Sequence, residues 1–190
     1  MKLIDIIEKR RSYYQIDKNL PVGEDEIIKL VQKATEFTPD SFNMKSSRVI
    51  VALGAKHDEL WDAIYDAFEG KVPREKIDSF KAGAGTVLYF IDEPTVASLQ
   101  EKFPVYAANF PHWATQAVGM LEFNVWTGLR ELNIGATIQH YNPVINDGVH
   151  ELFDLPETWV LDAQMPFGGI VAEPDARIPE DIDVRVKIIR

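Results

Sequence analysis

Hydrophobic side chains recur at intervals of three and four residues along much of the chain, a pattern that predicts amphipathic helices. The clearest example covers residues 24–37, where three acidic residues open the segment and complement the positive end of the helix dipole. The same periodicity predicts shorter helices at residues 57–68, 74–81, 94–102 and 146–153, and a first short helix that starts at residue 3 and ends near residues 10–12.

A longer pattern at residues 113–132 has a different character. Apolar side chains are spread around nearly every side of this predicted helix, and only three of its residues carry a charge. Such a helix must be covered by other structure on nearly every side. Asn133 and Gly135 are expected to end it, because both residue types accept the left-handed backbone that often closes a helix.

Strands are predicted from apolar runs that are too short for helices. Uninterrupted runs at residues 48–53 and 86–91 predict strands that are buried on both faces. A third, short strand is expected at residues 136–138. A fourth is expected at residues 159–171, broken by Pro166 and by the two glycines that follow it.

Two segments, residues 15–22 and 103–111, contain proline or glycine breakers and are expected to be loops. In the C-terminal tail, Val184, Val186 and Ile188 alternate with polar residues, which is typical of a strand. We expect this tail to leave the body and add a strand elsewhere. A detachable tail and an oversized apolar helix in so small a protein indicate a partner subunit.

These elements predict an α+β protein with about four strands and more helix than strand. The 190 residues fit one domain, residues 1–190, and 46% hydrophobic content with four tryptophans is enough for a full core.

The composition narrows the possible functions. A net charge of −10 argues against a nucleic-acid surface, since phosphate binding needs clustered cations. No stretch is long and apolar enough to suggest a membrane span, and no export signal is visible. The absence of cysteine excludes disulfides and thiol catalysis. We therefore expect a cytoplasmic protein that binds neither nucleic acid nor membrane.

Three polar clusters are candidates for a site. Arg10, Arg11 and Ser12 suit a phosphate or another oxyanion, or else they form a solvated helix end whose cations complement the carbonyl dipole. Ser41 and Asn43 offer hydrogen bonds to a heterocycle or a ribityl chain, or else they bond the backbone of their own turn.

The third cluster, residues 139–142, follows the apolar run that ends at Ile138. Within it, His140 is a candidate acid, base or stacking ring, the alternative being a strand end with a satisfied histidine. No phosphate-loop motif, metal-ligand spacing, nucleophile motif or carboxylate pair is present. If the protein is an enzyme, a bound cofactor is expected to carry the chemistry.

Residues 9–12, residues 39–43 and the long central helix together resemble the flavin-dependent nitroreductase family. Three further stretches, residues 80–88, 139–143 and the short tail 185–187, are similar to one subgroup of small nitroreductases, the fatty-acid-repression-mutant type. The likeness extends over essentially the whole chain. It implies a nitroreductase-like α+β fold, with a central mixed sheet of four to five strands surrounded by helices, and an intertwined homodimer with a C-terminal extension.

The resemblance also implies that FMN binds at the dimer interface. By position, residues 10–12 and 185–187 hold its phosphate and ribityl chain, residues 41–43 come from the partner subunit, and residues 139–141 line the isoalloxazine ring. The implied cofactor-binding residues are Arg10, Arg11, Ser12, Ser41, Asn43, Gln139, His140, Tyr141, Arg185 and Lys187. This sequence departs from the family pattern at residues 40, 44 and 45.

The activity implied is an FMN-dependent NAD(P)H oxidoreductase. In a ping-pong cycle, NAD(P)H passes a hydride to flavin N5, and a small-molecule acceptor such as a nitroaromatic or a quinone then receives the electrons. An alternative is a non-catalytic flavin-binding regulatory protein linked to lipid or stress signalling. A third possibility is a dimeric scaffold without a cofactor, which predicts a colourless protein.

Overall fold

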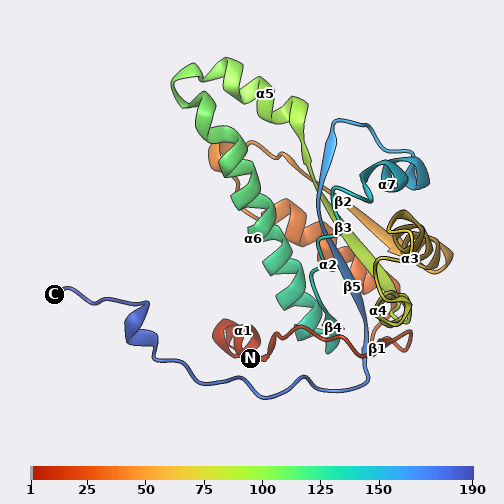
Figure 1. The fold of residues 1–190 in the computed structure, drawn as a ribbon. Coiled ribbons are helices and arrows are strands. Elements are labelled where there is room, and N and C mark those ends of the chain that lie inside the picture. Colours follow the sequence, from red (N-terminus) through yellow and green to blue (C-terminus); the bar gives the residue numbers. More distant parts are fainter. Residues whose placement is uncertain (1) are drawn as a thin grey trace.

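The computed structural model describes residues 2–190, which are built around a five-stranded sheet (Figure 1). The strand order is β1-β5-β3-β2, and β4 also pairs with β5. Every named strand pair is antiparallel, and one isolated bridge, between Ser12 and Ala136, is parallel. The strands are β1 (Ile16–Asp17), β2 (Ser47–Leu53), β3 (Gly85–Asp92), β4 (Ile134–Ala136) and β5 (Trp159–Ile170).

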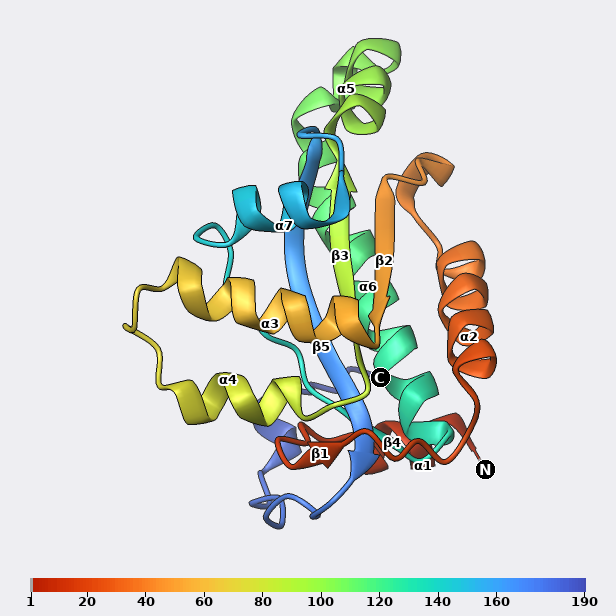
Figure 2. The ribbon, with the colours of Figure 1, turned by 90° about the vertical axis from the view of Figure 1, so that its right-hand side faces the viewer.

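Helices cover both faces of the sheet. Helices α2 and α6 lie on one face, and α3, α4 and α7 lie on the other (Figure 2). None of the helices within residues 2–190 has the length and apolar character needed to span a bilayer. The helices are α1 (Leu3–Lys9), α2 (Glu24–Phe37), α3 (Ala55–Ala67), α4 (Arg74–Lys81), α5 (Glu93–Lys102), α6 (Phe110–Glu131) and α7 (Asn146–Phe153), with 3₁₀ turns η1 (Ser41–Asn43), η2 (Pro104–Asn109) and η3 (Ile182–Val184).

The central strand β3 has an uninterrupted apolar sequence because both of its faces are covered by helices. Side chains alternate across a strand, so Val87 and Tyr89 enter the core under α6, while Leu88 and Phe90 enter the core under α3 and α7. All four are fully buried. The prediction of a strand buried on both faces is therefore confirmed.

The strongest helix patterns were predicted well. Helices α2 and α4 have the predicted boundaries, and α6 begins three residues earlier than expected, with Pro111 in its first turn, where no backbone N–H is needed. The residue that ends α6 is Asn133, which adopts a left-handed φ of 60°. The expected second stop, Gly135, lies within β4 instead.

The prediction of a break in β5 was wrong, because this strand runs without interruption from Trp159 to Ile170. Pro166 lies opposite Thr86 of β3 and turns its carbonyl the other way, towards Thr137, so its missing N–H removes no bond to β3. A Cβ at Gly168 would meet the backbone oxygen of Asp17. The glycines therefore admit β1 at close range rather than ending β5.

Other local predictions also need correction. The predicted loop at residues 15–22 contains β1, which forms because β5 supplies hydrogen-bond partners that are invisible locally. The predicted loop at residues 103–111 contains η2 and the start of α6. The strand expected at residues 136–138 is β4, two residues earlier. Residues 182–184 of the tail form η3, and no strand forms there within the chain.

Helix α6 is not covered on every side by its own chain. Its sheet-facing side is buried, but Met120 is 42% exposed and Phe123 is 37% exposed. Gly119 completes this face, and a Cβ there would touch nothing. An apolar stripe on a 22-residue helix is therefore left open to solvent within one chain, and the expectation that a partner subunit covers it stays a prediction.

Candidate functional site

The C-terminal half of α6 supports a cluster of cations. Helix α1 ends at Lys9, and the next residue, Arg10, places its guanidinium 4.1 Å from the centre of the Trp126 ring. Burial, reinforced by the positive charges of Arg177 and Arg11, lowers the pKa of Arg10. The buried Nε of Arg10 has no hydrogen-bond partner. A partly buried group of like charges with an unused donor favours an anion as ligand.

The segment after this cluster lies against β4. Ser12 forms the parallel bridge with Ala136, and the Tyr13 N–H donates to the Ala136 carbonyl at 3.1 Å. The predicted phosphate-binding residues and the predicted ring-lining residues are thereby brought to the same edge of the sheet, because Gln139 follows β4 by only three residues.

Residues 139–141 differ in how they are held. The Gln139 and Gln164 backbones exchange two hydrogen bonds of 2.7 and 2.9 Å, whereas the side chain of His140 is exposed. Tyr141 is buried, and its N–H donates to Oε1 of Gln164 at 2.8 Å. The ring of Tyr141 contacts Trp61 and Phe68 in the core under α3.

The phenol of Tyr141 has no partner for its oxygen, and burial raises its pKa to about 12. The ring of Tyr141 is therefore part of the core under α3, while the neighbouring His140 side chain is exposed. The assignment of residues 139–141 to a flavin ring stays a prediction.

The N-terminal half of α6 carries an aromatic cluster around η1. Phe42 stacks on Trp113 with ring centres 5.6 Å apart and also contacts Phe103, Tyr106 and Phe110. These contacts fix the loop that carries Ser41 and Asn43 to the start of α6. Phe42 remains 47% exposed, so the cluster presents an aromatic surface beside the loop.

The loop backbone is strained. Phe42, Asn43 and Lys45 have positive φ values of 58°, 50° and 57°, which non-glycine residues adopt rarely. The Arg48 guanidinium holds the Lys45 carbonyl at 2.8 Å and pairs with Asp92 of β3 at 2.6 Å. The sheet therefore holds the loop in this conformation.

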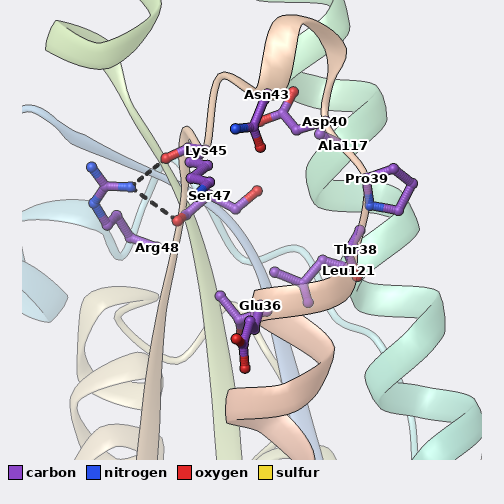
Figure 3. A pocket seen from close by; sticks show the side chains of 11 residues that line it. Glu36, Thr38, Pro39, Asp40, Asn43, Lys45, Ser47, Arg48, Ala117 and Leu121 are labelled. Atoms are coloured by element: carbon purple, nitrogen blue, oxygen red, sulfur yellow. Dashed lines mark hydrogen bonds between the residues drawn. The ribbon is translucent and has the colours of Figure 1, made fainter.

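A cavity of about 310 Å³ opens beneath this loop, and Figure 3 shows the side chains around it. Asp40, Asn43 and Lys45 line it from the loop, and Ala117 and Leu121 line it from α6. Burial raises the pKa of Asp40, although Ser46 donates to its carboxylate from both N–H and Oγ. Polar groups above an apolar floor suit part of a heterocyclic ligand.

Arg185 and Lys187 are exposed on the tail, which leaves the body beyond α1 (Figure 1). Arg185 bonds both carboxylate oxygens of Glu180, at 2.8 and 3.1 Å, within the tail itself. The structure does not bring these two cations to Arg10 within one chain. Their assigned role in a phosphate site needs a second subunit and stays a prediction.

The two halves of the candidate site lie at opposite ends of α6. Thirteen residues separate Trp113, which contacts Phe42, from Trp126, which contacts Arg10. At 1.5 Å per residue this is about 20 Å of helix. One chain therefore does not join its own Asn43 to its own Arg10 around a common ligand.

Two groups near these halves were not predicted from the sequence. Arg177 joins the cations around Arg10 from a distance of 167 residues in sequence, in a segment without periodicity. Glu122 is the buried acidic residue of α6, and its pKa is raised by burial and by the neighbouring Asp162. An acidic residue within an otherwise apolar helix was the available signal for Glu122, and no local signal pointed to Arg177.

Comparison with known proteins assigns this arrangement to a family. The model of the nitroreductase family matches residues 7–169. The chain is 32% identical to the nitroreductase FRM2 of Saccharomyces cerevisiae over 92% of this chain and 91% of that protein. It is also similar to the nitroreductase CinD of Lactococcus lactis in complex with chloramphenicol, at 37% identity and a TM-score of 0.95 with both chains fully covered.

The same Lactococcus lactis enzyme in complex with nicotinic acid superimposes with a TM-score of 0.93 at 38% identity, again over 100% of both chains. The likeness covers the sheet, the long helix α6 and the extended tail alike. The chain belongs to the nitroreductase family and is an oxidoreductase of the nitroreductase type.

Proposed function

We propose that the protein is an FMN-dependent NAD(P)H oxidoreductase that reduces nitroaromatic or quinone-type acceptors in a ping-pong cycle. The observation that carries the proposal is the cation cluster around Arg10, whose buried Nε lacks a partner in a chain of net charge −10. A phosphate monoester carries about two negative charges and three acceptor oxygens, which these donors fit.

We infer that a homodimer completes the site. Gly119 and Met120 lie midway between Trp113 and Trp126 on the open face of α6. If two copies of α6 cross antiparallel at this point, the Asn43 end of one subunit meets the Arg10 end of the other. The same crossing covers the apolar stripe, and large hydrophobic interfaces are typical of obligate dimers.

Each half of the site has a definable task. Arg10, Arg11 and Ser12 bind the phosphate and ribityl chain, and the aromatic cluster around Phe42 excludes water from the ring. Asn43 is held by its strained loop, so it presents hydrogen bonds without further ordering. When bound, FMN supplies the hydride chemistry at N5.

The substrates are proposed from chemistry and likeness. Chloramphenicol, with which the Lactococcus lactis relative was solved, contains a nitroaryl group, and nicotinic acid shares its pyridine ring with the nicotinamide of NAD(P)H. These ligands belong to that relative. For this chain they support an aromatic acceptor and a nicotinamide donor that occupy the same site in turn.

We further infer that residues 1–190 form one flavin-binding domain. The family model matches most of the chain, and the three hydrophobic clusters all include residues of the same sheet. The cytoplasmic location stays a prediction from the sequence.

The test of this proposal begins with the absorbance spectrum of the purified protein. A yellow protein with flavin bands is expected, or uptake of FMN on reconstitution. Anaerobic mixing with NADH or NADPH should then bleach these bands rapidly, and 4-nitrobenzoate should restore them. Flavin that resists bleaching would favour the regulatory alternative, and a protein that never takes up FMN would exclude both.

The phosphate assignment makes a separate prediction. Arg10→Ala removes the partly buried guanidinium over Trp126, and Lys187→Ala removes a tail cation, so both should lower FMN affinity by about tenfold or more. Equilibrium dialysis measures the bound fraction. Arg74→Ala, an exposed arginine of α4, is the matched control and should bind FMN as the wild type does. Unchanged FMN affinity in both test variants would remove the assignment.

A further inference from the structure

The segment after β5 passes the end of α1 and is hydrogen-bonded to residues 8–13. We call residues 173–177 the strap. The Tyr13 hydroxyl donates to Glu173 at 2.8 Å, and Arg11 Nη2 donates to the Asp175 carbonyl at 2.6 Å. Arg177 Nη2 donates to the carbonyls of Glu8 at 2.8 Å and Arg10 at 2.9 Å. Beyond Arg177, the side chain of Arg185 bonds Glu180 within the tail itself, so the strap is a point where the tail is held to the body.

Arg177 lies at the C-terminal end of α1, where it donates hydrogen bonds to backbone carbonyls. The last carbonyls of a helix lack intrahelical donors, and a cation near them is favoured by the helix dipole. Arg177 satisfies two such carbonyls at the end of α1 with one planar group. One of them belongs to Arg10 itself, so the bond restrains the backbone from which the Arg10 side chain extends over Trp126.

The same guanidinium adds charge where an anion is expected. Arg177 Nη2 lies 2.9 Å from the Arg10 carbonyl, and burial, then the positive charges of Arg177 and Arg11, lowers the pKa of Arg10. Their mutual repulsion opposes a cluster without a ligand, and a bound dianion reverses the sign of this interaction. Arg177 is also the last fixed point before the tail that carries Arg185 and Lys187.

We propose that Arg177 is a positioning residue of the cofactor phosphate site, which acts by holding Arg10 and Arg11 against the strap. The inference rests on the proposed FMN function and adds a residue to it. Arg177 contributes through its two backbone bonds and its charge, and Arg11 is oriented by the strap carbonyl of Asp175. When the strap is bound in place, the phosphate-binding residues Arg10 and Arg11 are held in place as well.

The experiment compares FMN with riboflavin, which has the same ring and ribityl chain but no phosphate. Dissociation constants are measured on apoprotein by flavin fluorescence quenching for the wild type, Arg177→Ala, Arg177→Lys and Arg190→Ala. Arg177→Ala should weaken FMN binding by about tenfold, the scale of one charged hydrogen bond, and change riboflavin binding by less than about twofold. Arg177→Lys keeps the charge but not the planar two-carbonyl contact, so an intermediate loss is expected.

Arg190→Ala is the matched control, since it removes one exposed tail arginine and should leave both affinities unchanged. Riboflavin binding reports whether each variant is folded. Normal FMN affinity in Arg177→Ala, or equal losses for FMN and riboflavin, would overturn the role of Arg177 while leaving the proposed function standing. A wild-type protein that binds no FMN would instead overturn the proposed function, and this inference with it.

Discussion

Glutamate at both positions 120 and 123 should leave the protein monomeric and without flavin. Met120 and Phe123 form the exposed apolar stripe of α6, and burying each against a partner is worth about 1.5–3 kcal/mol. Two carboxylates on a two-fold axis meet their own copies, which adds repulsion and desolvation. Because the α6 residues that contact Phe42 and Arg10 lie about 20 Å apart along the helix, loss of the dimer also separates the two halves of the site.

Sedimentation velocity and the FMN-to-protein absorbance ratio measure this result. Ala67→Glu with Lys71→Gln is a control with the same change of net charge, placed at exposed positions around the end of α3 on the other face of the sheet. This control should remain dimeric and yellow. A double glutamate variant that stays dimeric would show that α6 does not form the interface, and a monomer that retains FMN would show that one chain holds the whole site.

The free energy of unfolding of this protein should fall as the pH rises towards 8.5, and Glu122→Gln should remove most of that fall. Glu122 is 7% exposed, one of its oxygens has no partner, and it lies near the fully buried Tyr89. Burial, then the hydrogen bond to Asp162 and its charge, raises the pKa of Glu122 from 4.5 to about 8. Asp162 occupies the irregularity in the β3–β5 register, where Tyr89 pairs with Ala163 but Phe90 pairs with Leu161.

The direction in which the free energy of unfolding changes with pH follows from proton binding. Between pH 4.5 and about 8 the folded protein keeps the Glu122 proton while the unfolded chain releases it, so stability falls as pH rises through this window. One pKa unit is about 1.4 kcal/mol, which sets an upper limit of about 5 kcal/mol. Because Asp162 is partly exposed and solvent screens its charge, we expect less than this limit, a loss of about 2 kcal/mol by pH 8.5.

Urea unfolding at pH 5, 6.5 and 8.5, at one fixed protein concentration, measures this dependence. The glutamine amide can still donate to Asp162 but carries no ionisable proton, so the variant should exceed the wild type in free energy of unfolding at pH 8.5. Glu131→Gln, at an exposed position of the same helix, should retain the wild-type slope. Equal pH slopes in the wild type and Glu122→Gln would contradict the buried-acid assignment.

Secondary structure was predictable where periodicity was strong and local. Helices α2 and α4 have the predicted ends because amphipathic spacing and breakers act within a few residues. The strand β5 was misjudged at Pro166 because the effect of a proline depends on which neighbour its missing N–H would face. The two-residue strand β1 was missed because its stability comes from β5 and from glycines far away in sequence.

The sequence indicated which residues to expect in the site better than it indicated how those residues are arranged. Arg10, Arg11 and Ser12 were singled out as an anion-binding group, and they lie beside β4 and a tryptophan that no spacing rule indicates. Tyr141 was expected at a ring surface, and its side chain entered the core because aromatic partners on α3 bury it. Arg177 contacts Arg10 only because the chain after β5 turns back across α1.

The sequence by itself determined the family resemblance, the α+β class, the unusual apolar character of residues 113–132 and the polar clusters around Arg10, Asn43 and His140, because these depend on residue types and short spacings. Only the tertiary structure decided that α6 has one uncovered stripe and that the Arg10 and Asn43 groups lie at opposite ends of this helix. It also decided that the carboxyl of Glu122 is buried and that the strap crosses near Arg10. These are contacts between residues far apart in sequence, and they follow from how the elements pack against one sheet.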